Sequence, residues 1–162
     1  MTVELEGFDE LEHRLAELLQ TTDAAGRTRL AHRIGRELRN SQARRIRDNL
    51  SPDGSAFVPR KAREPLRQAR GRIRRRIKSG AMFRKMGRAA ALRWEASPDG
   101  VAVGFVGSAL QRIARVHQLG LRDQVAPYSG APVADYPERR LLGLTDRERG
   151  RILDLVLEAL QG

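Results

Sequence analysis

The positive charge of this chain is concentrated in one stretch of its sequence. Between Arg60 and Arg93 there are 14 Lys or Arg side chains and a single acid, Glu64, a net charge of +13. The whole chain carries +11, which leaves −2 for all other residues. So many like charges cannot share a core without partners. We therefore expect a nearly neutral folded body carrying one basic segment that meets nucleic acid, an acidic protein face or counterions.

The composition narrows the class of protein further. A chain of 162 residues suits one ordinary domain, with a core made mainly of aliphatic side chains because only seven residues are aromatic. The absence of cysteine excludes disulfides, thiolate metal sites and cysteine nucleophiles, and agrees with a reducing cytoplasm. We expect no signal peptide, and no membrane span, because no apolar run approaches about 18 residues.

Apolar residues at steps of three and four predict two helices in the N-terminal part. The first covers residues 8–20, with a stripe formed by Phe8, Leu11, Leu15, Leu18 and Leu19. The second covers residues 27–50, where Leu30, Ile34 and Leu38 share one face and the remainder is largely polar. We expect it to dock by a narrow face and to end at the turn sequence of residues 51–54.

A β-hairpin is predicted over residues 91–107. Leu92, Trp94 and Ala96 alternate with charged residues, and Val101, Val103 and Phe105 alternate after a Ser-Pro-Asp-Gly turn. Trp94 and Phe105 are therefore expected to be structural residues of the sheet.

Capping signals delimit two later helices. Ser108 with Gln111 predicts a capping box that opens a short helix bearing Leu110, Ile113 and His117 on one face, and Gly120 suits its C-terminal end. Residues 121–137 read as a loop with one or two short extended pieces. Thr145 with Glu148 predicts a second capping box, followed by an amphipathic helix with Ile152, Leu153, Val156, Leu157 and Leu160.

These elements predict an α+β fold, a small antiparallel sheet packed with several helices. We expect one domain overall, made of an N-terminal helical region over residues 1–54, a basic linker or arm over 55–90 and a compact body over 91–162.

Few residues carry a signal for catalysis or metal binding. None of His13, His32 and His117 stands beside a second plausible metal ligand, and the acids are scattered singly. His117 lies on an apolar helical face, so we interpret it as a buried or half-buried histidine bonded to a backbone carbonyl. We predict no enzyme activity, no metal and no cofactor.

The run from Arg70 to Lys78 leaves three interpretations open. It could dock on an acidic neighbouring protein, contact DNA phosphates without sequence preference, or remain a solvated arm. No aromatic side chain is interleaved for base stacking and no DNA-reading motif is present, so sequence-specific binding is not expected. A second candidate interface is the corner around Arg139, Arg140 and Leu142, although the leucines could equally be core and the arginines solvated. The candidate interface residues are therefore Arg72, Arg74, Arg75, Arg76, Lys78, Arg84, Lys85, Arg139, Arg140 and Leu142.

Four stretches in order give the chain a resemblance to a known family. They are Asn49–Gly54 with Phe57, Pro59, Arg60 and Lys61; Leu66–Ile73 with Met82–Met86; Val106–Leu121; and Tyr136–Thr145. Together they span roughly residues 28–160, and the chain resembles the phage virion morphogenesis, or tail-completion, proteins of contractile-tailed phages.

The resemblance implies a structural virion protein at the neck, at the head-proximal end of the tail, assembled in the bacterial cytoplasm. It implies a homohexameric ring around the DNA channel and contacts with a tail terminator, tail tube or head–tail connector, without catalysis, cofactor or membrane. The alternatives are a non-specific DNA-binding protein that uses the Arg-rich segment 60–88, a tail terminator and a head morphogenesis factor.

Overall fold

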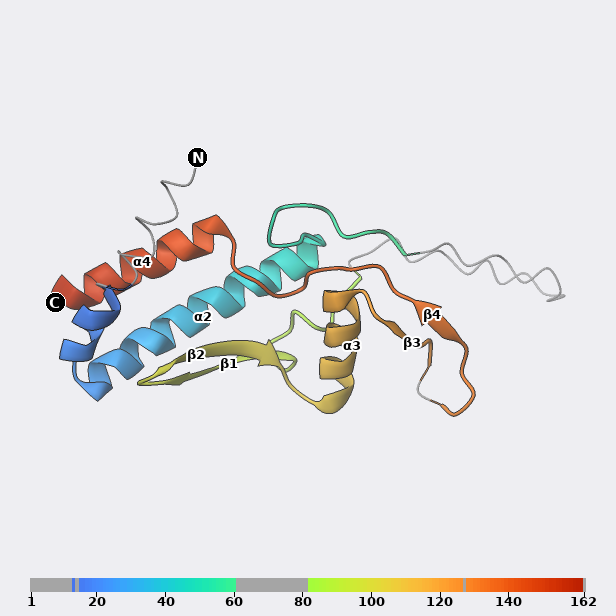
Figure 1. The fold of residues 1–162 in the computed structure, drawn as a ribbon, viewed down its shortest axis with the longest axis horizontal. Helices are drawn as coiled ribbons and strands as arrows, with labels where there is room; N and C mark the ends of the chain where they lie inside the picture. The colour runs from blue at the N-terminus through green and yellow to red at the C-terminus, as the bar shows by residue number, and fades with distance from the viewer. Residues whose placement is uncertain (1–12, 14, 61–81, 127, 162) are drawn as a thin grey trace, which may run out of the picture.

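A computed structural model describes residues 13, 15–60, 82–126 and 128–161 of the chain. Its central element is the helix α2 (Ala24–Asp48). The hairpin of β1 (Leu92–Ser97) and β2 (Gly100–Phe105) lies along one side of α2, and α4 (Asp146–Gln161) lies along another (Figure 1). A second unit holds α3 (Ser108–Leu119) and the short strands β3 (Arg122–Gln124) and β4 (Val133–Asp135). The predicted α+β class is confirmed.

Residues at its two ends fix the length of α2. The Asp23 side chain caps the first turn by accepting a hydrogen bond from the Gly26 N–H, and Asn49 ends the helix in the left-handed conformation. The helix therefore stops two residues earlier than predicted. The turn at residues 51–54 follows, and Leu50 pairs with Ala56 beyond it.

The buried face of α2 is wider than the sequence indicated. Leu30, Ile34 and Leu38 are buried as predicted, but so are Gln42 and Arg45 of the polar remainder, which we expected to be left to water or a partner. The prediction of a narrow docking face was wrong because α2 is covered from two directions, by the hairpin and by α4.

The hairpin has the predicted alternation. Leu92 pairs with Phe105, and Trp94 pairs with Val103, so the apolar side chains of both strands share the face toward α2. Close packing follows at Gly35 on α2, where an added Cβ would lie 2.8 Å from the Trp94 ring and 2.9 Å from a Val101 methyl. A larger residue at position 35 would push the hairpin away from the helix.

The start of α3 differs from the prediction. Gly107 is the N-cap and no side chain caps the helix, whereas Gln111 donates from Nε2 to the Phe105 carbonyl. The Ser108 capping box is therefore wrong, while the left-handed Gly120 at the C-terminal end is confirmed. Ile113, placed on the apolar face, is 43% exposed, and Ala114 and Val116 are buried instead.

The second capping box is confirmed at the start of α4. The Thr145 hydroxyl accepts from the Glu148 N–H at 3.1 Å, and the Glu148 carboxylate accepts from the Thr145 N–H at 2.8 Å. Four of the five predicted apolar residues pack on the core, with Val156 buried and Ile152, Leu153 and Leu160 partly buried. Leu157 was wrongly placed, since it is 45% exposed, and Leu155 is fully buried instead.

Two apolar clusters make up the core. One joins α4 with the first half of α2 and with Leu15, which belongs to the helical residues 15–21 of the predicted first helix. Leu18 of that predicted stripe is half exposed, and residues 8–12 and 14 lie outside the described residues. The other cluster centres on Ile46, Leu92 and Leu141 and joins the end of α2 to the hairpin and α3.

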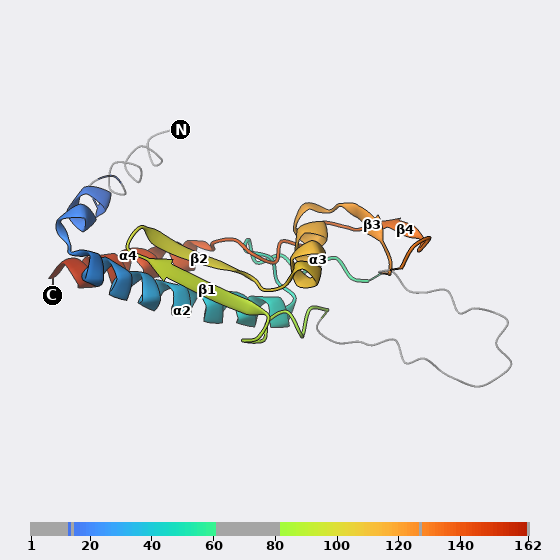
Figure 2. The same ribbon diagram turned by 90° about the horizontal axis from the view of Figure 1, so that it is seen from below.

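The strands β3 and β4 pair antiparallel and extend from α3 at the end opposite to α4 (Figure 2). The predicted short extended pieces within residues 121–137 are confirmed. Among the described residues, no helix is long and apolar enough to span a membrane.

Candidate functional site

Several hydrogen bonds hold the two ends of the Arg-rich segment on the folded body. Residues 61–81 lie outside the described residues, but both flanking positions are described. The Arg60 guanidinium donates through Nη2 to the Met82 carbonyl at 2.6 Å, and the Met82 N–H donates to Asn49 Oδ1 at 2.9 Å. The two ends of the segment are therefore held together, beside the end of α2.

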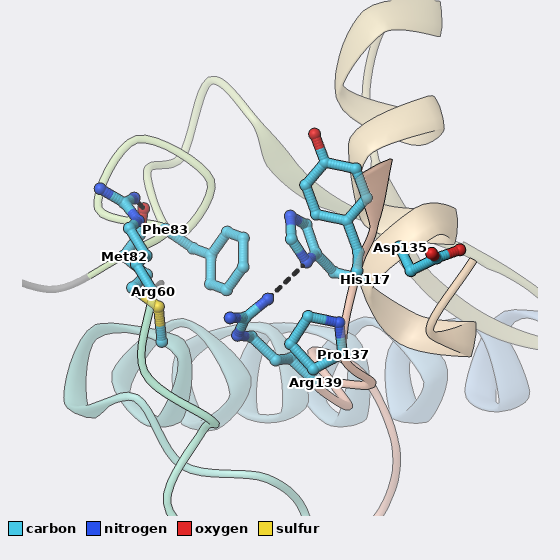
Figure 3. Close-up of a pocket in the computed structure, with 8 residues that line it drawn as sticks. Arg60, Met82, Phe83, His117, Asp135, Pro137 and Arg139 are labelled. Carbon is cyan, nitrogen blue, oxygen red and sulfur yellow. Dashed lines mark hydrogen bonds between the residues drawn. The ribbon is translucent and has the colours of Figure 1, made fainter. Parts of the chain in front are cut away.

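Arg139 holds residues 58 and 59, which lead into the Arg-rich segment. Its Nε donates to the Val58 carbonyl at 2.7 Å, and its Nη2 donates to the Pro59 carbonyl at 3.2 Å. Its Nη1 lies 3.0 Å from His117 Nδ1 (Figure 3). Because a guanidinium only donates, Nδ1 is the acceptor and the ring proton of His117 sits on Nε2.

His117 is half-buried in a line of aromatic rings. Edge-to-face contacts join Phe57 to Phe83, Phe83 to His117 and His117 to Tyr136, with centroids 4.8–5.7 Å apart. Burial, with the positive charges of Arg139 and Arg60, lowers the pKa of His117 to about 4. The ring is therefore neutral at physiological pH. Its bonding partner is the Arg139 guanidinium, so the predicted ring bond to a backbone carbonyl was wrong.

A pocket of about 220 Å³ opens beside these groups. Arg60, Arg139, His117 and the acid Asp135 line it, together with apolar and aromatic side chains. Its lining contains no Ser, Thr, Cys or Lys side chain that could serve as a nucleophile. Over the described ranges no three His, Asp or Glu side chains are grouped to hold a metal ion.

A buried ion pair fixes the corner that precedes α4. Arg45 Nη1 donates to both carboxylate oxygens of Glu148 at 3.2 and 3.3 Å, and Arg45 Nη2 donates to the Gly143 carbonyl at 3.0 Å. Both side chains are more than nine-tenths buried. Glu148 thus serves the helix cap and the ion pair at once.

The predicted interface residues differ in whether the structure describes them and in how exposed they are. Arg72, Arg74, Arg75, Arg76 and Lys78 lie outside the described residues. Arg84 and Lys85 are exposed just after the basic run, Arg140 is exposed, and Leu142 is half-buried. Arg139 is only 4% exposed, so the alternative in which both arginines of the corner are solvated is wrong for Arg139. Whether the remaining residues form an interface stays a prediction.

Sequence reasoning missed Arg45 and the bracing role of Arg139. Neither residue stands out locally, because its partners come from segments far along the chain. The capping box at Thr145 pointed to Glu148 but carried no information on the second partner of that carboxylate.

Comparisons with known proteins show which family this chain belongs to. The profile described as the phage virion morphogenesis family matches residues 7–161. Tail completion protein S of Escherichia phage P2 is 34% identical over 154 residues, which cover 95% of this chain and 97% of that protein. No solved structure matches the chain. The family profile and the aligned relative each cover nearly the whole sequence, and the chain therefore belongs to the phage virion morphogenesis family.

Proposed function

We propose that this protein completes the tail of a tailed phage and enables it to join the head. The observation that carries the proposal is the end-to-end similarity to the tail completion protein of phage P2, which leaves little of either chain unmatched. The protein acts as a structural part, at the neck of the virion, and it is assembled in the bacterial cytoplasm.

The protein is proposed to work as a homohexameric ring around the channel through which DNA passes. Copies of one chain that contact each other through two different faces can close into a ring, which suits a part at the end of a tube. Several large apolar side chains are exposed on the described surface, among them Leu119, Val125 and Tyr128, which suits burial between copies.

The Arg-rich segment is proposed to fasten the ring to an acidic face of a neighbouring tail or neck protein, such as the terminator, the tube or the connector. Arg60, Asn49 and Arg139 hold its two ends on the folded body. Charge of this density steers an encounter, while apolar contacts retain the partner. Arg84 and Lys85 continue the positive surface onto the described part of the chain.

A charge reversal tests this fastening role. Changing Arg74, Arg75 and Arg76 together to Glu should strongly reduce the yield of complete particles. The matched control reverses three exposed arginines outside the basic stretch, Arg36, Arg44 and Arg115, with the same change in net charge. Equal yields from both triple variants would remove the fastening role from the segment.

The charge density of the same segment favours a second candidate, non-specific binding of DNA. A gel shift at about 0.05 M and about 0.2 M salt separates the two, because phosphate contacts release counterions and weaken steeply with salt. Tight binding at low salt that collapses at the higher salt would favour DNA. Weak binding at both would favour a protein partner.

The tail role is tested by electron microscopy of a lysate of the phage that encodes the protein, with a stop codon in place of Arg33. We expect full heads lying beside free tails of normal length. Overlong tails would indicate a tail terminator instead, and empty or malformed heads a head morphogenesis factor. Normal infectious particles would refute the structural role.

A further inference from the structure

The pocket of about 220 Å³ at the base of the Arg-rich segment has an unbalanced set of charges. The guanidiniums of Arg60 and Arg139 both line it, and Asp135 is the single acid among its described lining residues. The Asp135 side chain is 83% exposed and lies 4.0 Å from Arg122, so water and that arginine offset its charge. The pocket is therefore positive, with little to balance it in the described part of the chain.

Arg139 is a buried charge whose described partners are all neutral. The residue is only 4% exposed, and its guanidinium donates to two backbone carbonyls and to the neutral ring nitrogen of His117. These bonds use three of the five N–H donors of a guanidinium. Arg45, which is also buried, has the Glu148 carboxylate beside it. Because a buried charge is costly without a counter-ion, an anion bound near Arg139 would be stabilised.

Arg60 adds a second positive charge, and this one is exposed to solvent. Its described acceptor is the Met82 carbonyl, which again is neutral. Burial lowers the pKa of Arg139, and the charge of Arg60 lowers it further, so the two guanidiniums repel each other. An anion in the pocket would relieve this repulsion, with direct contact from Arg60 and support from the charge of Arg139 behind it.

The remaining lining selects the kind of anion. It is apolar or aromatic and comes from Met82, Phe83, Tyr136 and Pro137 (Figure 3). Pockets for cofactors and drug-sized ligands enclose about 300–1,000 Å³, so this smaller pocket suits one or two side chains. A carboxylate next to an apolar side chain matches both the charge and the lining. A DNA phosphate matches them less well, because apolar walls offer it no donors and Asp135 repels the phosphates on either side.

We propose that this pocket anchors the neighbouring virion protein by taking one of its acidic side chains together with the apolar side chain beside that acid. This inference rests on the fastening role proposed above and names the contact at the base of the segment. Arg60 and Met82 flank the Arg-rich segment, so an acidic surface attracted by the segment arrives next to the pocket. An arginine among aromatic groups is also a common centre of binding energy in interfaces.

A small probe tests the pocket on the purified full chain. The probe is 3-phenylpropanoate, which joins a carboxylate to an aromatic ring, and the control compound is the neutral 3-phenylpropanamide. The Arg139 Nε–H, held on the Val58 carbonyl at 2.7 Å, reports binding through its NMR shift. We expect a saturable shift with the acid, and binding of the amide that is roughly tenfold weaker, because hydrogen bonds to a charged acceptor are stronger.

Variants of the exposed arginine test which charge is responsible. Arg60→Gln should weaken binding of 3-phenylpropanoate about threefold to fivefold, and Arg60→Lys, which keeps the charge, should weaken it less. Arg115→Gln is the matched control, since Arg115 is exposed two residues before His117 and does not line the pocket. In the phage, Arg60→Gln should lower the yield of complete particles and Arg115→Gln should not.

Four results would overturn the inference. Equal affinity for the acid and the amide would mean that the pocket selects no charge. Tighter binding of dimethyl phosphate than of 3-phenylpropanoate would assign the pocket to a nucleic-acid phosphate. Binding seen only in Glu64→Gln would mean that the single acid between Arg60 and Arg93 occupies the pocket in place of a partner. Equal particle yields from Arg60→Gln and Arg115→Gln would remove the pocket from assembly.

The stop-codon experiment tests the tail role without reference to this pocket. A phage that needs the protein for its tail, combined with a chain that binds no probe, would refute the anchor alone. Normal particles from the stop-codon phage would refute the tail role whatever the probe does, so the two failures are distinguishable.

Discussion

Replacing Glu148 with Gln removes one charge from the buried pair that fixes the start of α4. The variant keeps a side-chain oxygen able to accept from the Thr145 N–H, so the helix cap is retained while the charge opposite Arg45 is lost. Arg45 would then be a buried guanidinium without a carboxylate. Its remaining acceptors are the Gly143 carbonyl at 3.0 Å and the Leu141 carbonyl at 3.5 Å.

The magnitude follows from this geometry. Removing one partner of a buried ion pair costs about 3–5 kcal/mol, because the other charge stays desolvated. The two carbonyl contacts of Arg45 place the expected cost at the lower end, about 3 kcal/mol. Loss of the cap alone, in Thr145→Ala, should cost about 1 kcal/mol. Since small domains unfold with about 5–15 kcal/mol, a loss of about 3 kcal/mol in Glu148→Gln should remove a large part of the stability while leaving the chain folded.

Urea unfolding followed by circular dichroism, at one chain concentration, measures these differences. The double variant Arg45→Met with Glu148→Leu removes both charges and should recover much of the loss. A cost for Glu148→Gln no larger than that of Thr145→Ala would refute the ion pair as a stabilising element of the corner.

Three further variants test particular contacts. Gly35→Ala should lower the free energy of unfolding by roughly 1–2 kcal/mol, because the clash with Trp94 outweighs a gain of about 1 kcal/mol in helix propensity. Because the pKa of His117 is lowered in the folded state, the unfolded state binds the proton more readily. The free energy of unfolding should therefore fall as the pH drops from about 6.5 toward 4. His117→Asn should remove this part of the pH dependence, as measured by urea unfolding. The free energy of unfolding of Asn49→Ala, measured in urea, should be about 1 kcal/mol lower than that of Asn49→Gly. Both variants lose the hydrogen bond to Met82, but only alanine is strained at φ 59°.

Each of these variants has a control and a contrary outcome. Gly150→Ala, in α4 with nothing within 4 Å of the added Cβ, should be neutral or stabilising, and equal effects at Gly35 and Gly150 would contradict the packing account. An unchanged pH dependence of stability in His117→Asn would mean that other groups cause the loss of stability at acid pH. Equal stability of the two Asn49 variants would mean that the left-handed residue carries no strain.

The sequence predicted the elements whose signals are local. Alternation over residues 92–105 gave the hairpin, and the Thr145–Glu148 spacing gave the start of α4, because each pattern is complete within a few neighbouring residues. Most of the buried face of α4 was predicted, but Leu157 was included and Leu155 left out, since apolar residues occur on both sides of that helix and only its packing decides which are buried.

The buried hydrogen bonds and ion pair of Arg45, Glu148 and Arg139 could not be predicted in this way. Arg45 and Glu148 are 103 positions apart, and Arg139 meets carbonyls about 80 positions away, so each pairing exists only after the fold has formed. A charged side chain read from sequence alone is assigned to the surface, which is right for Arg84 and Arg140 and wrong for Arg45 and Arg139.

Completion of unfinished particles by the purified protein tests the tail-completion role. A lysate of the stop-codon phage, containing separate heads and tails, is mixed with the wild-type chain, and infectious particles are counted as its concentration rises. We expect the titre to rise with added protein and electron microscopy to show heads joined to tails. Heads and tails that stay separate at every concentration, with the titre unchanged, would contradict it.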